Sequence, residues 1–147
     1  MNQKALDYIR QNQAAAMITL REDGSPHAVR VGIAVVDGKI WSSGTADRMR
    51  TRHLRRDPRA TLFVFPQTAG PAGYGGLGVD AEVTILEGPD APHLNLTLFR
   101  AMQRLAPDAD TISWFGAEKT PGEFLATMVE EKRLVYEFTP TRTYGMF

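Results

Sequence analysis

Apolar residues recur at two spacings along this 147-residue chain, and the two spacings predict its helices and strands. Near the N-terminus, Ala5, Leu6 and Ile9 share one face at helical spacing, which predicts an amphipathic helix over residues 2–13. Helical spacing returns over residues 94–105. Runs of β-forming residues predict strands at residues 14–21, 26–36, 39–43, 59–65, 79–86 and 133–138.

Turn and capping residues separate these elements. Asp37-Gly38 predicts a two-residue hairpin turn after the second strand. Thr120 and Glu123 form a capping-box pattern with Pro121 between them, which predicts a helix running to about Lys132. Residues 140–147 are expected to form an extended tail after the last strand.

The order of the elements predicts the fold class. Three sequential strands precede a short helix, and two further strands precede the later helices and the last strand. A doubly wound sheet would alternate strand and helix throughout, so this order favours a mainly β protein, a β-barrel with peripheral helices. No repeat or linker divides the chain, and we expect one domain spanning residues 1–147.

Composition narrows the classes of function. The chain is 43% hydrophobic and 23% charged, as is typical of a globular protein. It has no cysteine and its three histidines are scattered, so no metal site is expected. No apolar run approaches the roughly 18 residues of a membrane span, and residues 1–13 lack the apolar segment of a signal peptide. We therefore expect a cytoplasmic protein with no membrane partner.

Positive charge is concentrated in residues 46–59. This window holds six of the chain's 17 basic residues and two acidic residues, and Asp57-Pro58 is expected to end a short helix there. Like charges on one helical face are mildly destabilising unless an anion lies nearby. The arginines expected on one such face are Arg48, Arg52, Arg55 and Arg59.

Three functions are open to this segment: an anion site, a nucleic-acid patch or a solvated helix face. Thr45 or Asp47 can cap the helix start, where free N–H groups favour an anion, and Arg48 and Arg50 would grip a phosphate there. Cations at the far end favour the helix dipole, so three arginines are interpreted as structural: Arg55, Arg56 and Arg59. The pI of about 6.8 argues against nucleic acid.

Other motifs carry less information. Residues 73–78 fit G-x-G-x-x-G, but a strand follows them instead of the helix that dinucleotide binding needs, so an ordinary glycine-rich loop is favoured. His27 and His53 are interpreted as structural. No catalytic side chain is predicted, and a cofactor is expected to carry the chemistry.

The run from Arg48 to Arg59 and the strand after it resemble the split β-barrel flavin and deazaflavin oxidoreductases, the superfamily of pyridoxamine 5′-phosphate oxidase. Residues 24–27, residues 42–43 and the closing residues 133–145 fit the same pattern. The resemblance covers nearly the whole chain and is greatest to the branch that uses coenzyme F420, a deazaflavin. It implies an antiparallel Greek-key split barrel of the FMN-binding type, and a homodimer with cofactor sites at the interface.

The resemblance also implies which residues bind the cofactor. Arg48 and Arg50, helped by Thr51, would hold its phosphate. Ser42 and Ser43 would line the ribityl and phosphate region. The residues implied along the ring system are Arg30, Val31 and Gly32, and the missing side chain of Gly32 suits close approach of a flat ring.

The implied activity is hydride transfer from reduced F420 to an electron-poor small molecule, such as an activated alkene, a quinone or a tetrapyrrole. Two departures argue against vitamin B6 oxidation: Ala34 stands where a basic residue would meet substrate phosphate, and the tail lacks an Arg-x-His pattern. An FMN-dependent oxidoreductase and a non-catalytic F420 or flavin carrier remain alternatives. Residues 66–76 and Trp114-Phe115 are candidate borders of the substrate pocket.

Overall fold

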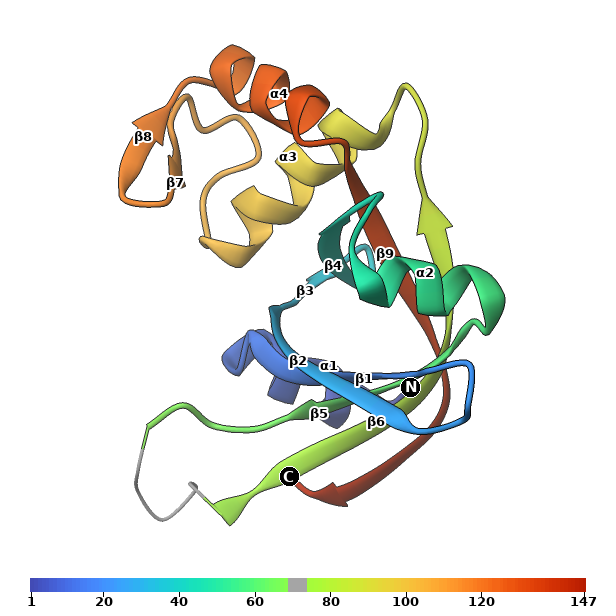
Figure 1. The fold of residues 1–147 in the computed structure, drawn as a ribbon. Helices are drawn as coiled ribbons and strands as arrows, with labels where there is room; N and C mark the ends of the chain where they lie inside the picture. The colour runs from blue at the N-terminus through green and yellow to red at the C-terminus, as the bar shows by residue number, and fades with distance from the viewer. Residues whose placement is uncertain (69–73) are drawn as a thin grey trace.

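A curled antiparallel sheet of seven strands forms the body of the protein in the computed structural model, which describes residues 1–68 and 74–147 (Figure 1). The strands are ordered β2-β1-β5-β6-β9-β4-β3. Their bounds are Ala14–Leu20 (β1), Pro26–Gly32 (β2), Ala34–Val36 (β3), Lys39–Thr45 (β4), Arg59–Val64 (β5), Gly76–Leu86 (β6) and Arg133–Met146 (β9). The predicted fold class, a mainly β antiparallel barrel with peripheral helices, is confirmed.

Four helices and a small hairpin accompany the sheet in the part of the chain that the structure describes. The helices are α1 (Gln3–Gln11), α2 (Met49–Arg56), α3 (Ala91–Met102) and α4 (Pro121–Glu130), and the hairpin joins β7 (Ile112–Trp114) to β8 (Ala117–Lys119). In Figure 1, α3, α4 and the hairpin gather at one end of the sheet, and α2 lies beside β4. None of the helices in the described ranges is long and apolar enough to cross a membrane.

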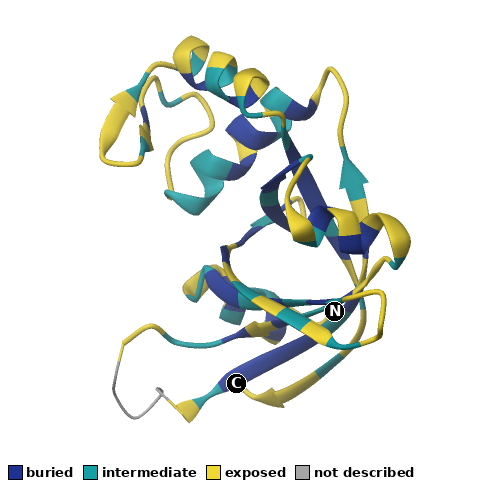
Figure 2. Ribbon diagram, in the orientation of Figure 1, coloured by how far each residue is buried: buried dark blue, intermediate teal, exposed yellow. Residues whose placement is uncertain are grey.

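The main core lies inside the curled sheet. Ala5 and Ile9 of α1 are completely buried there, and the side chain of Asn2 caps the helix by accepting from the Ala5 N–H. Long buried stretches of β6 and β9 run through this region (Figure 2). A second cluster packs α3 against β3, β4 and β9, and a third joins α3, α4 and β7.

The predicted turn and cap are confirmed. Asp37 and Gly38 have φ values of 49° and 77°, as the tight turn between β3 and β4 requires. Thr120 and Glu123 form the reciprocal capping box at the start of α4. The helix ends at Glu130, two residues before the predicted end, because Lys132 turns into the left-handed region with φ 53°.

Several predicted elements begin or end a few residues from their expected bounds, and two differ more substantially. Residues 26–36 form two strands, because the chain leaves β1 after Gly32 and pairs with β4 from Ala34; the Ile33 N–H between them donates to the Gln13 carbonyl. The expected tail at residues 140–147 continues β9 to Met146, paired with β6 across a register shift at Asp80 and Ala81. In this pairing the backbone N–H and C=O groups of residues 140–146 find hydrogen-bond partners on β6, although the sequence pattern of the tail predicted no strand there.

Candidate functional site

The start of α2 carries the basic residues that the sequence singled out. Arg48 is the N-cap, in extended conformation, and its side chain makes no capping hydrogen bond. The predicted caps were wrong, because the Thr45 hydroxyl donates to the Asp47 carboxylate at 2.8 Å instead. The first turn of α2 is therefore left without a side-chain acceptor for its N–H groups, a setting that favours an anion.

Arg50 is half-buried beside this helix start. One of its terminal nitrogens donates to the Ser43 carbonyl at 3.3 Å, and its guanidinium lies 5.7 Å from the centre of the Tyr136 ring. Its Nε is buried and has no acceptor among the described residues. Burial lowers the pKa of Arg50, although a guanidinium stays protonated in proteins.

Thr51 is fully buried and its hydroxyl is already engaged. It donates to the Thr45 carbonyl at 2.7 Å and forms a short hydrogen bond with the Tyr136 hydroxyl. The Tyr136 ring has room there because Gly44 carries no side chain: a Cβ at Gly44 would lie 2.2 Å from the Tyr136 hydroxyl oxygen. Thr51 therefore anchors α2 to β9 and leaves its side chain little capacity for a ligand.

Ser42 and Ser43 connect β4 to its neighbours. The Ser42 hydroxyl, which is buried, donates to the Gly32 carbonyl at 2.7 Å and so joins β4 to the end of β2. The Ser43 hydroxyl donates to the Asn95 side-chain oxygen of α3 at 2.5 Å, while the Ser43 carbonyl accepts from Arg50. Both serines thus lie between β2, α2 and α3.

The three residues predicted along the ring system occupy different surroundings. Arg30 is exposed and donates to the Gln67 side-chain oxygen at 2.8 Å. Val31 is buried in the main core. Gly32 is exposed, and a Cβ there would lie 3.0 Å from the sulfur of Met102 on α3, a tight contact that a small shift of the flexible Met102 side chain would relieve.

The arginines in the second half of the segment have acceptors within the protein. Arg55 makes two bonds to Glu87, Arg56 donates to the Leu20 carbonyl, and Arg59 makes two bonds to Asp57. The hydrogen bonds from Arg59 lower the pKa of Asp57 to about 2. Arg59 lies on β5, so the expected arrangement of four arginines on one helical face was wrong.

Hydrogen bonds therefore join four of the eight predicted residues in two pairs, Gly32 with Ser42 and Ser43 with Arg50. Arg48 and Thr51 flank Arg50 at the start of α2, which brings six of the eight near one another. Their role in binding stays a prediction. Sequence reasoning missed Tyr136, which contacts both Arg50 and Thr51, and Asn95, which holds Ser43. A glycine inside a strand, Gly44, was the one available signal of a close approach.

The two candidate borders of the substrate pocket, residues 66–76 and Trp114-Phe115, are distant in sequence from the start of α2. Residues 69–73, part of the predicted pocket border and of the G-x-G-x-x-G pattern, fall outside the described residues. Gly76 and Gly78 belong to β6, where a Cβ would collide with the rings of Phe63 and Tyr144 respectively, so these glycines make room for aromatic rings. Trp114 and Phe115 lie at the β7–β8 turn, where Phe115 is 88% exposed.

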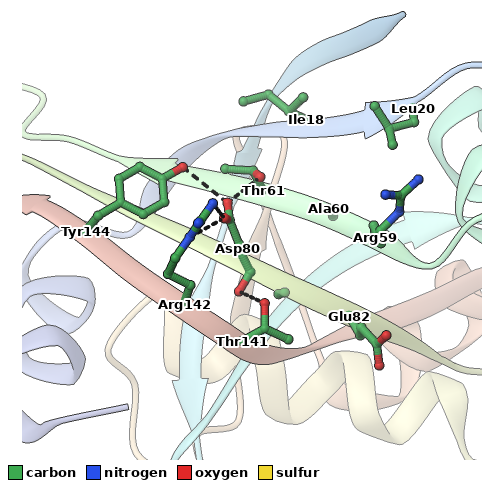
Figure 3. Close-up of a pocket in the computed structure, with 11 residues that line it drawn as sticks. Ile18, Leu20, Arg59, Ala60, Thr61, Asp80, Glu82, Thr141, Arg142 and Tyr144 are labelled. Atoms are coloured by element: carbon green, nitrogen blue, oxygen red, sulfur yellow. Dashed lines mark hydrogen bonds and ion pairs between the residues drawn. The ribbon is translucent and has the colours of Figure 1, made fainter. Parts of the chain in front are cut away.

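A groove of about 780 Å³ crosses the outer face of β1, β5, β6 and β9 (Figure 3). The Asp80 carboxylate at its centre accepts from Thr61, Arg142 and Tyr144. These bonds lower the pKa of Asp80, with the Thr61 contribution the largest. The rim carries both signs of charge, from Arg59, Glu82 and Arg142, above a floor that includes Ile18.

Comparison with known structures places this fold among several solved ones. A conserved hypothetical protein of Mycobacterium tuberculosis superposes with a TM-score of 0.72 at 21% identity, covering 99% of this chain and 84% of the other. A protein named F420 reductase gives a TM-score of 0.64 at 16% identity, with 94% of each chain covered. A heme binding protein of Mycobacterium smegmatis gives 0.65 at 14% identity, covering 99% of this chain and 55% of that one.

These likenesses lie below 25% identity and show the fold alone. A search of curated protein sequences finds no match. The family model described as pyridoxamine 5′-phosphate oxidase matches residues 1–146. That match spans the whole sheet, the arginine segment and the helices described above, and the chain belongs to the pyridoxamine 5′-phosphate oxidase family.

Proposed function

We propose that the protein is an oxidoreductase that uses coenzyme F420, with the cofactor's phosphate held by Arg48 and Arg50 at the start of α2. The observation that carries this proposal is the buried Nε of Arg50, which has no acceptor among the described residues. A buried polar group without a partner is unfavourable, and a charge-assisted hydrogen bond that the Nε–H donates to a phosphate oxygen would satisfy it. The N–H groups at the start of α2, which no side chain caps, are further donors close to Arg50 in the chain.

The rest of the site supports the cofactor indirectly. The hydroxyls of Ser42 and Thr51 are engaged within the protein, so these residues fix β4 and α2 while Arg48 and Arg50 make the phosphate contacts. Residues 30–32 lie at the end of β2, where Ser42 of β4 bonds the Gly32 carbonyl, and in this proposal their backbone groups would border the ring of the cofactor. When bound, reduced F420 supplies a hydride to an electron-poor acceptor such as an activated alkene, a quinone or a tetrapyrrole.

FMN is the second candidate cofactor, because the same arginines would bind the phosphate group of either cofactor. The chain also belongs to the pyridoxamine 5′-phosphate oxidase family, whose name refers to a phosphate-bearing substrate. The structural neighbour named F420 reductase supports the deazaflavin. The neighbour named as a heme binding protein supports a third possibility, a carrier that binds a planar ligand without turnover.

Titration of the purified protein with F420 and with FMN, followed by a panel of acceptors, tests the proposal. The expected result is micromolar F420 binding and oxidation of reduced F420 by at least one acceptor. Tighter FMN binding with flavin turnover would establish the second candidate, and binding without turnover would establish a carrier. If neither cofactor binds at micromolar concentration, the proposal fails.

The proposed assembly is a homodimer with the cofactor at the interface, formed through the outer face of the sheet. Outward-facing positions of an exposed antiparallel sheet are normally polar. Here they include the aromatic residues Phe63 and Tyr144, which are 42% and 46% exposed. The mixed charges around Asp80 suit a two-fold interface, in which each patch meets its own copy.

A further inference from the structure

Two histidines that are far apart in sequence meet between β1, β2 and α2. His53 of α2 is only 8% exposed, and its Nδ1 lies 2.8 Å from the Thr19 hydroxyl of β1. The ring of His27 on β2 packs edge-on against His53, with centroids 5.1 Å apart and an interplanar angle of 82°. The Nδ1 of His27 is buried and has no hydrogen-bond partner in the described parts of the chain.

The charged groups around His53 are all basic. Arg56 of the same helix donates to the Leu20 carbonyl, and Arg21 of the β1–β2 turn donates to the Pro26 carbonyl. Burial is the largest cause that lowers the pKa of His53, and His27, Arg56 and Arg21 lower it further. The neutral imidazole is therefore the form that the folded protein favours.

This pair holds the same helix that carries the anion site. A helix of eight residues is too short to be stable alone, so α2 depends on its buried contacts. The buried residues of α2 are Thr51, His53 and Leu54. Arg50 directly precedes Thr51, and any movement of α2 away from β1 moves the guanidinium.

We infer that His53 is a positioning residue for the anion site: its contacts with Thr19 and His27 seat α2 on the barrel while the His53 imidazole is neutral, and protonation of His53 loosens the helix and weakens anion binding by Arg50. The identity of the anion rests on the proposed function, but the seating of α2 does not.

The sign of the effect separates this inference from simple electrostatics. Added positive charge near an anion site would by itself tighten binding as the pH falls. Loosening of α2 predicts the reverse. Because the pKa of His53 is lowered in the folded state, its stabilising contribution is present above about pH 6.5 and is lost as the pH falls below that value.

Cofactor affinity measured between about pH 7.5 and about pH 5.5 is the first test. His53→Asn keeps a hydrogen-bonding group near Thr19 and cannot titrate, and subtracting its pH profile removes the titration of the cofactor's own phosphate. The wild type should lose roughly five-fold more affinity for FMN or F420 than His53→Asn over this range, or about 1 kcal/mol. His93→Asn, on the exposed surface of α3, should follow the wild type. Equal or tighter wild-type binding at low pH would overturn the inference.

Amide hydrogen exchange of the ligand-free protein is the second test, and it stands even if no cofactor binds. As the pH is lowered, the protection factors of the α2 amides should decrease in the wild type and stay constant in His53→Asn. His27→Asn removes one of the groups that lower the pKa of His53, so it should shift the loss of protection to higher pH. Protection of α2 that is independent of pH in the wild type would overturn the inference, whatever the outcome of the cofactor titration.

Discussion

At the scale of single residues, Arg50 differs from the other arginines of its segment in being both half-buried and incompletely bonded. Arg55 and Arg59 make bidentate pairs with Glu87 and Asp57 and need no further partner. Arg50 donates one long hydrogen bond to the Ser43 carbonyl, and its guanidinium lies against the Tyr136 ring. Its Nε is buried and has no acceptor among the described residues. Burial of an unsatisfied donor is unfavourable unless a ligand or a partner completes it.

Arg50→Ala should therefore weaken cofactor binding by about 1.5–3 kcal/mol, the contribution of a charge-assisted contact. Arg56→Ala is the matched control. It removes the same charge from the same helix, but the contact that is lost is the one to the Leu20 carbonyl rather than one to the cofactor. Calorimetric titration near pH 8, where the His53 imidazole is neutral, measures both variants. Equal losses would show that the segment acts only through its total charge.

At the scale of elements, α2 is placed by β4 and β9 more than by its own sequence. Gly44 of β4 leaves space for the Tyr136 ring of β9, and the Tyr136 hydroxyl then meets Thr51 of α2. These contacts fix the position of α2 relative to β4 and β9. The Thr45 hydroxyl, which would otherwise cap the helix, is bonded to Asp47.

Gly44→Ala should destabilise the protein by at least about 2 kcal/mol and weaken cofactor binding, because the new Cβ would lie 2.2 Å from the Tyr136 hydroxyl oxygen. Gly122→Ala in α4 is the control: it has open space around its Cβ position, and the same substitution should leave stability unchanged or raise it by up to about 1 kcal/mol. Urea unfolding monitored by circular dichroism gives both values. A tolerated Gly44→Ala would contradict the packing described for Tyr136.

At the scale of the whole molecule, the sheet has two unlike faces. The inner face packs α1 and the main core, whereas the outer face carries the groove around Asp80 together with partly exposed aromatic rings (Figures 2 and 3). One cross-strand row on this face runs through Ala28, Ile18, Thr61, Asp80 and Arg142. A second copy of the chain would cover this row in the proposed homodimer.

Ala28→Arg should dissociate that homodimer, because it places a bulky charge on the outer face without disturbing the core. Ala126→Arg on the exposed side of α4 adds the same charge elsewhere and should leave the mass unchanged. Sedimentation velocity measures the oligomeric state of each. A wild-type monomer would refute the homodimer, and a dimer that tolerates Ala28→Arg would place its interface on another surface.

The acid stability of the whole fold depends on carboxylates that basic or hydroxyl groups hold in the ionised form. The pKa of Asp57 is lowered to about 2 by Arg59, so its contribution is present above about pH 4 and is lost as the pH falls through 2. Asp57→Asn should flatten the fall in unfolding free energy over this window, whereas Asp110→Asn, at an exposed position, should not. Urea unfolding at several pH values would detect the difference, and parallel curves for the wild type and Asp57→Asn would contradict it.

The sequence by itself determined the local elements, because their signals act within a few residues. The turn at Asp37-Gly38, the capping box at Thr120 and the strand predicted at residues 79–86 are all present. The order of the elements was enough for the fold class, and the arginine segment was enough to locate a candidate anion site.

Only the tertiary structure decided which of those residues are free to act. The hydroxyls of Ser42 and Thr51 look available in the sequence, but partners 10 and 85 residues away engage them. The sequence suggested Gly32 as a place for a ring, and the structure adds that Met102 of α3 packs close to it. The meeting of His27 with His53 and the unsatisfied Nε of Arg50 have the same origin: they depend on pairings between distant strands, whose contacts no local pattern records.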